Sequence, residues 1–203
     1  MLRIKLLSLF MLVLFFAGNK ADSGYQIGDT VKDFELNNID GETLSLSDFE
    51  DEKGVILVFD CNTCPYSQAY LDRIKALHSK YKSKGFPVVA INSNDAGKSP
   101  GDSYEKMVEY AESHGYEHDY LYDEAQQVAK AFGATNTPHV FVLKNNDGEF
   151  KVAYIGAIDN NTRDADAVSK KYVEDAVDAL LEDKQPPVNK TKAIGCTIKW
   201  KSA

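Results

Sequence analysis

The chain has 203 residues, of which 43% are hydrophobic and 27% are charged, and its formal net charge at pH 7 is -8. This length and composition are those of about one folded domain, and they exclude a chain that is mainly disordered. The acidic balance argues against binding to nucleic acid or to anionic lipid, because both carry charge of the same sign.

The first 21 residues have the pattern of an export signal. Arg3 and Lys5 precede an apolar run at residues 6–17, which is too short for an ordinary membrane-spanning helix. We expect residues 1–21 to be a signal peptide, or an N-terminal membrane anchor if they are retained, and the protein to be periplasmic or secreted. A buried N-terminal helix is the alternative, but the run has no polar face.

Strand and helix patterns alternate along residues 22–184, which we expect to form one domain. A small hairpin is predicted to turn at Asp40-Gly41, and the apolar run "GVILVF" (54–59) is typical of a strand that is buried on both faces. Residues 66–81 then have one apolar helix face, and "FPVVAI" (86–91) predicts a second buried strand.

Two short helices, a hairpin and a last helix follow. The two short helices are predicted from capping boxes, in which an acidic residue is paired with Glu or Gln three positions later: Asp102 with Glu105, and Asp123 with Gln126. Residues 139–143 and 150–158 predict a β-hairpin, and an apolar helix face runs from Ala165 to Leu180. We expect residues 185–203 to form an arm that packs on the domain.

This order of elements predicts an α/β fold with a central mixed β-sheet flanked by helices and an N-terminal β-hairpin extension. A thioredoxin-like fold fits it, and such a fold should have a thiol after the first core strand and a proline before the hairpin. Cys61 and Cys64 follow the first core strand, and Thr137-Pro138 precedes His139.

Cys64 is the predicted nucleophile on local grounds. Pro65 suits the first position of a helix, which makes Cys64 the helix cap. A thiolate at that position faces unpaired backbone N–H groups and the positive end of the helix dipole, so its pKa should be lowered. The opposite assignment, with Cys61 attacking and Cys64 resolving, keeps the usual C-x-x-C order but puts Pro65 inside the first turn.

Three motifs resemble those of one family. "CNTCP" (61–65), "VVAINSND" (88–95) and "IGCTIKW" (194–200) resemble the peroxiredoxin-like group of the thioredoxin-fold redoxin (AhpC/TSA-type) superfamily, and the likeness extends over residues 28–158. The resemblance implies a thiol-dependent oxidoreductase that carries out disulfide exchange or peroxide reduction.

The resemblance also suggests a role for each thiol in the motif. Counting from Phe59 in the thioredoxin pattern F-x-x-x-x-C gives Cys64, and Ser67 then replaces the usual resolving cysteine. Cys61 is the nearest candidate for the resolving thiol. Pro65 and Ser67 would support the start of the helix.

Thr137 and Pro138 complete the expected site, because in the thioredoxin fold this proline is cis and faces the nucleophile.

Cys196, in the arm, is a candidate second resolving thiol, and a cysteine that is merely packed under the arm is the alternative. We expect oxidation to join Cys61 to Cys64 and to leave Cys196 reduced. Asp60 is a candidate proton acceptor for the resolving thiol, or a solvated residue at a strand end.

Thiol peroxidase is the alternative enzymatic function, but the sequence departs from the peroxidase motif P-x-x-x-T-x-x-C. Leu57 takes the position of the proline and Cys61 that of the threonine. After residue 21 the chain has only Arg73 and Arg163, and neither lies on a predicted strand where a peroxide-binding arginine is expected.

A Sco-like copper chaperone is an alternative of another class, with Cys61, Cys64 and His139 as the ligands. His139 begins a strand and could equally be an exposed residue. A structural zinc site is disfavoured because no second ligand pair is present, and a thiol-dependent interaction module without turnover remains open.

We expect no cofactor beyond the redox-active cysteines. The expected substrate is a protein or small molecule that carries a thiol or disulfide, with peroxide as a further candidate, and membrane contact is expected only if residues 1–21 are retained.

Overall fold

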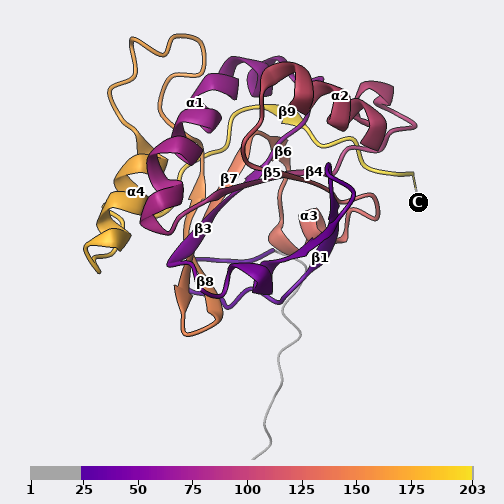
Figure 1. Cartoon of the computed structure of the whole chain (residues 1–203). Coiled ribbons are helices and arrows are strands. Elements are labelled where there is room, and N and C mark those ends of the chain that lie inside the picture. Colours follow the sequence, from indigo (N-terminus) through magenta and orange to yellow (C-terminus); the bar gives the residue numbers. More distant parts are fainter. Residues whose placement is uncertain (1–23, 203) are drawn as a thin grey trace, which may run out of the picture.

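The computed structural model describes residues 24–202, so the predicted signal segment lies outside the described residues. The centre of the fold is a seven-stranded mixed sheet in the order β2-β1-β5-β4-β3-β7-β8, and a separate two-stranded sheet pairs β6 with β9 (Figure 1). This confirms the predicted central mixed sheet with its N-terminal hairpin. Within residues 24–202, no helix has the length and apolar character needed to cross a membrane.

The strands follow the apolar runs of the sequence. In the centre, β3 is parallel to β4, and β4 is parallel to β5. All six residues of β3 are buried, as expected for a strand that is covered on both faces. The strands are β1 (Glu35–Asn38), β2 (Thr43–Ser45), β3 (Gly54–Phe59), β4 (Val88–Asn92), β5 (Asp119–Tyr122), β6 (Asn136–Thr137), β7 (His139–Asn146), β8 (Glu149–Gly156) and β9 (Cys196–Thr197).

The α-helices lie on both faces of the sheet. They are α1 (Pro65–Tyr81), α2 (Tyr104–His114), α3 (Gln127–Phe132) and α4 (Tyr172–Leu181), with short 3-10 turns η1 (Leu46–Phe49), η2 (Lys82–Lys84) and η3 (Pro100–Asp102). Tyr70 of α1 and Val173 of α4 share one hydrophobic cluster with Val58 of β3. Phe132 of α3 belongs to a second cluster with the neighbouring strand residue Phe59. Because successive strand residues face opposite sides, α1 and α4 cover one face of the sheet and α3 covers the other.

Four sequence predictions differ from the structure. Asp123 does not cap α3, because Gln126 occupies the N-cap of that helix. Asp102 does not cap α2, because Ser103 occupies the N-cap and accepts a hydrogen bond from Lys106 N–H. Ala165 and Val168 lie outside α4, which begins only at Tyr172. The strand β5 was not predicted at all, because it is only four residues long and its polar flanks obscure the pattern.

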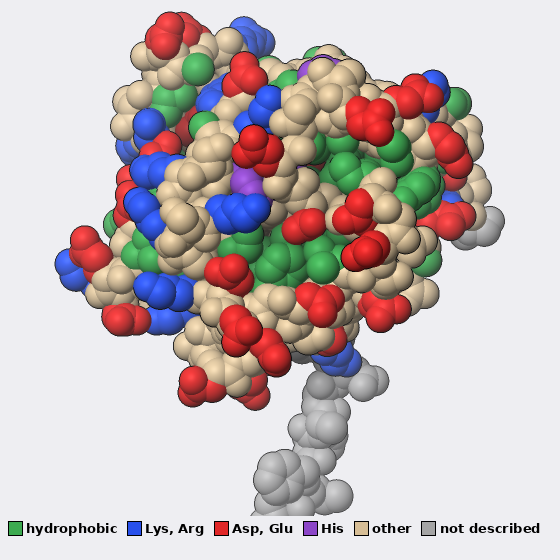
Figure 2. Space-filling view, viewed as in Figure 1, with side chains coloured by type: hydrophobic (Ala, Val, Ile, Leu, Met, Phe, Trp, Pro, Cys, Tyr) green, Lys and Arg blue, Asp and Glu red, His purple; other side chains and the backbone are tan. Residues whose placement is uncertain are grey.

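In the view of Figure 2, Asp and Glu side chains are scattered over the surface, most densely at its right and lower parts, and Lys and Arg side chains lie mainly on its left. An apolar patch is visible among these acidic groups, near the lower centre of the view. The acidic character agrees with the net charge of -8. Such a surface repels polyanions.

Candidate active site

Cys64 lies where the chain passes from β3 into α1. It has an extended backbone conformation at the N-cap, and Pro65 occupies the first turn of the helix. Its Sγ donates a hydrogen bond to the carbonyl oxygen of Thr137, at 3.1 Å. The Thr137–Pro138 peptide bond is cis, as the resemblance implied. The helix start and the loop before β7 therefore meet at the Cys64 sulfur.

Cys61 lies beside Cys64, and the two thiols have opposite proton affinities. The hydrogen bond between the two side chains lowers the pKa of Cys64 well below the ordinary value of a thiol, with further contributions from the Cys196 side chain and from the N–H groups of Ser67 and Cys196. The same bond, together with burial and the nearby carboxylates, raises the pKa of Cys61. Of the two thiols, Cys64 is therefore the one that ionises more readily.

Thr137 contacts both sulfur atoms. Its hydroxyl lies 3.2 Å from Cys61 Sγ, while its carbonyl accepts from Cys64. Hydrogen bonding to the Thr137 hydroxyl opposes the rise in the pKa of Cys61. Thr137 thus bridges the two positions between which a disulfide would form.

Asp60 is a buried carboxyl group at the end of β3. Burial raises its pKa from an ordinary 3.8 to about 7, against smaller lowering contributions from the Ser67 side chain and the backbone N–H of Cys61. Neither Asp60 Oδ1 nor Ser67 Oγ completes a hydrogen bond of ordinary geometry with a described residue. Asp60 is only 3% exposed, so it is not the solvated strand end that was the alternative interpretation. It can hold or release a proton near neutral pH.

Asp102 fixes the loop between the two cysteines. Its Oδ1 accepts hydrogen bonds from the backbone N–H groups of Asn62 and Thr63, at 2.8 and 3.3 Å. Its Oδ2 accepts from Thr63 Oγ1, Ser99 Oγ and Asn94 Nδ2, at 2.7, 2.6 and 2.9 Å. A sixth donor, Asn92 Nδ2, lies 3.5 Å from Oδ1. This role of Asp102 was not predicted from the sequence, because the spacing of Asp102 and Glu105 also fits a capping box. A fully buried carboxylate with six donors holds the loop in one conformation.

Cys196 belongs to the same site. Its strand, β9, pairs antiparallel with β6, and Cys196 lies directly opposite Thr137. The side chains of Cys196 and Cys64 interact, and burial is the main cause that raises the pKa of Cys196, to about 11. The Cys196 thiol therefore lies beside the predicted nucleophile, and its two interpretations, a second resolving thiol and a packed cysteine, both stay predictions. All three cysteines are free thiols.

His139 does not join the thiols in a metal site. Its ring is only 8% exposed, which contradicts the expectation of an exposed side chain. It packs at 4.8 Å from the ring of Phe141, and its Nδ1 accepts the backbone N–H of Thr135. Among residues 24–202, no three His, Cys, Asp or Glu side chains are grouped so that they could hold a metal ion. The arrangement gives no support to copper ligation by Cys61, Cys64 and His139.

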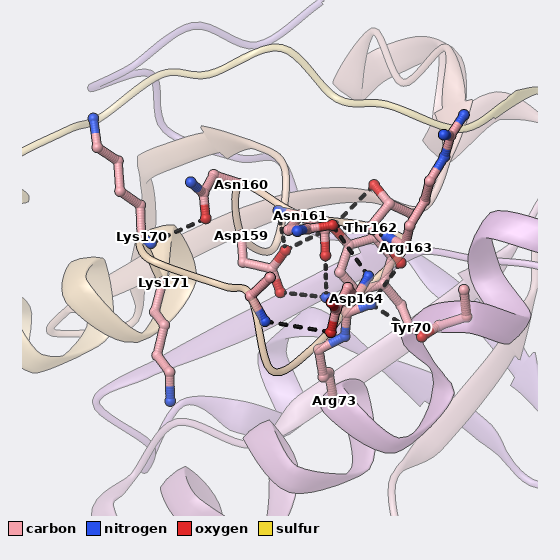
Figure 3. A network of polar contacts seen from close by, with 12 residues as sticks. Tyr70, Arg73, Asp159, Asn160, Asn161, Thr162, Arg163, Asp164, Lys170 and Lys171 are labelled. Atoms are coloured by element: carbon pink, nitrogen blue, oxygen red, sulfur yellow. Dashed lines mark hydrogen bonds and ion pairs between the residues drawn. The ribbon is translucent and has the colours of Figure 1, made fainter.

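The guanidinium group of Arg73 is engaged in a structural network on the outer side of α1 (Figure 3). It donates to Asp159 Oδ2 and to the carbonyl oxygens of Asn161 and Thr162, at 2.7, 2.7 and 2.9 Å. Figure 3 shows Arg163 with its side chain directed away from this network. Arg73 therefore secures the 159–164 loop through its two Nη groups.

The comparisons with known proteins agree with this arrangement. The sequence model of the AhpC/TSA family matches residues 27–153. A thiol-disulfide oxidoreductase ResA from Geobacillus kaustophilus is 30% identical over 65% of this chain and 71% of its own length. An uncharacterized conserved protein, also from Geobacillus kaustophilus, has a crystal structure with a TM-score of 0.81 and 37% identity over 88% of this chain and 94% of that one.

A putative thiol:disulfide interchange protein DsbE from Chlorobium tepidum is a more distant structural neighbour. Its TM-score is 0.54 and its identity 26%, over 64% of this chain and 84% of that one. These neighbours confirm the predicted thioredoxin-like fold.

Proposed function

Because this chain belongs to the AhpC/TSA family, we propose that it is a thiol-disulfide oxidoreductase of the peroxiredoxin-like group, with Cys64 as nucleophile and Cys61 as resolving thiol. The observation that carries the proposal is the pair of neighbouring thiols with opposite proton affinities at the start of α1. A thiolate beside a protonated thiol is suited to a two-step exchange, because the first attacks and the second resolves.

In the first step the Cys64 thiolate attacks one sulfur of a substrate disulfide. A bond forms between Cys64 and that sulfur, the substrate S–S bond breaks, and the other substrate sulfur leaves as a thiolate. The low pKa of Cys64 keeps it ionised at neutral pH and also makes it a good leaving group in the reverse direction.

In the second step Cys61 attacks the Cys64 sulfur and releases the remaining substrate thiolate. The two electrons that reduce the substrate come from the two protein thiols, which end as a Cys61–Cys64 disulfide. Cys61 must lose its proton before it attacks, and Asp60, whose pKa of about 7 suits proton transfer near neutral pH, is the acceptor that we propose. A thiol reductant that follows the same steps backwards restores the reduced pair.

The substrates that we propose are proteins or small molecules with a thiol or disulfide, in keeping with the names of the ResA and DsbE relatives. Neither step needs a group beyond the cysteines and Asp60. Export, which residues 1–21 predict, would place the thiols in an oxidising compartment where substrate disulfides persist.

Stopped-flow measurement of the reduced protein tests the proposal. Mixed with a small aromatic disulfide, the wild-type protein should release aromatic thiolate rapidly, and Cys64→Ser should release none. Mixed with hydrogen peroxide in a separate experiment, it should react slowly. Fast reaction with peroxide and slow reaction with the disulfide would contradict disulfide exchange and establish a thiol peroxidase.

A further inference from the structure

The short strand β9 occupies the backbone edge beside the nucleophile. Residues 136–137 of β6 pair with residues 196–197 of β9 in a two-stranded sheet that is separate from the main sheet. Side chains directly opposite each other in an antiparallel pair project from the same face, so Cys196 and Thr137 point the same way. Thr137 contacts both Cys61 and Cys64, and β9 therefore presents its thiol to the pair.

A glycine permits the close approach of this strand. Gly195 lies against the Thr137–Pro138 peptide, and a Cβ atom at position 195 would collide with the carbonyl oxygen of Thr137. Asn136 Nδ2 donates to the carbonyl oxygen of Gly195, at 2.9 Å, which fixes the strand from the other side. The segment is thus fitted to the loop that carries Thr137.

Polar contacts and one buried side chain hold the rest of the segment. Lys199 N–H donates to Asn94 Oδ1 and its carbonyl accepts from Gln126 Nε2, at 2.8 and 2.9 Å. Ile198 is buried in the cluster that contains Phe59. Asn94 also donates to Asp102, so a single amide connects the docked segment to the carboxylate that fixes the cysteine loop.

With β9 in place, the thiols are closed to a large substrate. Cys64 is 2% exposed and Cys61 is 3% exposed. The disulfide of another protein cannot align its S–S bond with the Cys64 sulfur unless β9, which covers that sulfur, moves away. The group that already faces Cys64 is the Cys196 thiol of the chain itself.

We propose that β9 is an internal substrate strand, which covers the Cys61–Cys64 pair until it is displaced and whose Cys196 forms a disulfide with Cys64. This inference rests on the proposed disulfide exchange and adds a third exchange thiol to it. When β9 leaves, β6 exposes unpaired N–H and C=O groups beside Cys64, and an extended disulfide-bearing polypeptide can bind there as a replacement strand.

The covalent step is an intramolecular exchange. Deprotonated Cys196 attacks the Cys64 sulfur of the Cys61–Cys64 disulfide, the Cys64–Cys196 bond forms, and Cys61 leaves as a thiolate that takes up one proton. No electrons enter or leave the protein. If a substrate is still attached to Cys64, the same attack releases the substrate thiolate instead.

The reduced Cys61→Ser protein, which keeps Cys64 and Cys196, tests this step with one small aromatic disulfide per protein. We expect two aromatic thiolates to be released, and peptide mass spectrometry without reduction to find Cys64 joined to Cys196. Release of one thiolate, with a stable mixed disulfide on Cys64 and a free Cys196, would overturn the inference and leave the proposed function standing. Release of none would contradict the proposed function and the inference with it.

Gly195→Ala tests the cover without changing a thiol. In otherwise wild-type protein it should speed the reaction of Cys64 with a peptide disulfide by about tenfold or more, because the added methyl group forces β9 from its position. In the Cys61→Ser background it should reduce the Cys64–Cys196 yield. Gly97→Ala is the matched control, since its methyl group would meet Asp95 at an ordinary 3.4 Å. Equal rates and yields in the two alanine variants would overturn the role of β9 as a cover.

Discussion

The Cys64 sulfur donates to the backbone carbonyl oxygen of Thr137, at 3.1 Å. A carbonyl oxygen stabilises the protonated thiol and not the thiolate, so this bond opposes ionisation. The low pKa of Cys64 therefore depends on the donors on its other sides: the Cys61 and Cys196 thiols and the N–H groups of Ser67 and Cys196. Removing individual donors should raise that pKa in a graded way.

The first prediction concerns the strongest of these donors. Cys61→Ala should raise the pKa of Cys64, whereas Cys61→Ser should raise it less because a hydroxyl group still donates. The absorbance of the thiolate near 240 nm, followed against pH in reduced protein, measures this even for a buried sulfur. Cys64→Ser identifies which part of the signal belongs to Cys64. Equal titration curves for wild type and Cys61→Ala would show that Cys61 does not stabilise the thiolate.

Thr137→Val should slow the resolving step. The Thr137 hydroxyl lies 3.2 Å from Cys61 and opposes the rise in its pKa, so its loss leaves Cys61 harder to deprotonate. We expect the second aromatic thiolate to appear about two- to tenfold more slowly, as for the loss of one hydrogen bond, while the first appears at an unchanged rate. Thr135→Val, in the same loop, is the control. A slower first phase with a normal second phase would argue against this role.

Asp60→Asn should stabilise the reduced protein at alkaline pH. In the folded protein burial raises the pKa of Asp60 from 3.8 to about 7. Its contribution to stability is therefore complete below pH 3.8 and is lost as the pH rises through 7, because only the unfolded chain ionises it freely. The variant should gain up to about 4 kcal/mol over wild type above pH 7 and little near pH 4.

Urea unfolding at pH 4, 6 and 8 measures the change for Asp60→Asn. Asp51→Asn, at an exposed position, is the control for the loss of one carboxylate. A stabilisation by Asp60→Asn of the same size at all three pH values would contradict a raised pKa. The same variant should also weaken the pH dependence of the resolving step.

Asp102→Ala should destabilise the protein and disorder the cysteine loop. Six donors would lose their acceptor in a buried position, and they come from Asn62, Thr63, Asn92, Asn94 and Ser99. We expect the free energy of unfolding to fall by about 3 kcal/mol or more, and the first aromatic thiolate to be released more slowly. Asp147→Asn, in the exposed turn between β7 and β8, should change neither. A wild-type rate in a destabilised Asp102→Ala protein would limit Asp102 to a role in stability.

Much of the fold could be predicted because local patterns and tertiary burial agree. The apolar runs at 54–59 and 86–91 contain β3 and β4, and Tyr70, Ile74 and Leu77 are buried along α1 as their spacing predicts. Tyr66, on the same predicted face, is 37% exposed. Periodicity identifies the apolar face of a helix, but it does not show which residues of that face are buried in the folded protein.

The site could be predicted only in part. The Cys-Pro sequence is a local signal, so Cys64 at the helix cap followed from it. Asp102 and Gly195 could not be found in this way, because their roles depend on residues about 40 and 60 positions away. A capping-box spacing and a glycine in a tail have local explanations of their own, and only the folded chain brings the two residues to the loops that they contact.

The central claim is that Cys64 attacks and Cys61 resolves. It is tested most directly in a Cys196→Ser background, where the third thiol cannot interfere, by peptide mass spectrometry after reaction with one small aromatic disulfide per protein. We expect Cys61→Ser in this background to keep the aromatic group as a mixed disulfide on Cys64, and Cys64→Ser to remain unmodified. A stable adduct on Cys61 in the Cys64→Ser protein, with none on Cys64 in the Cys61→Ser protein, would contradict it.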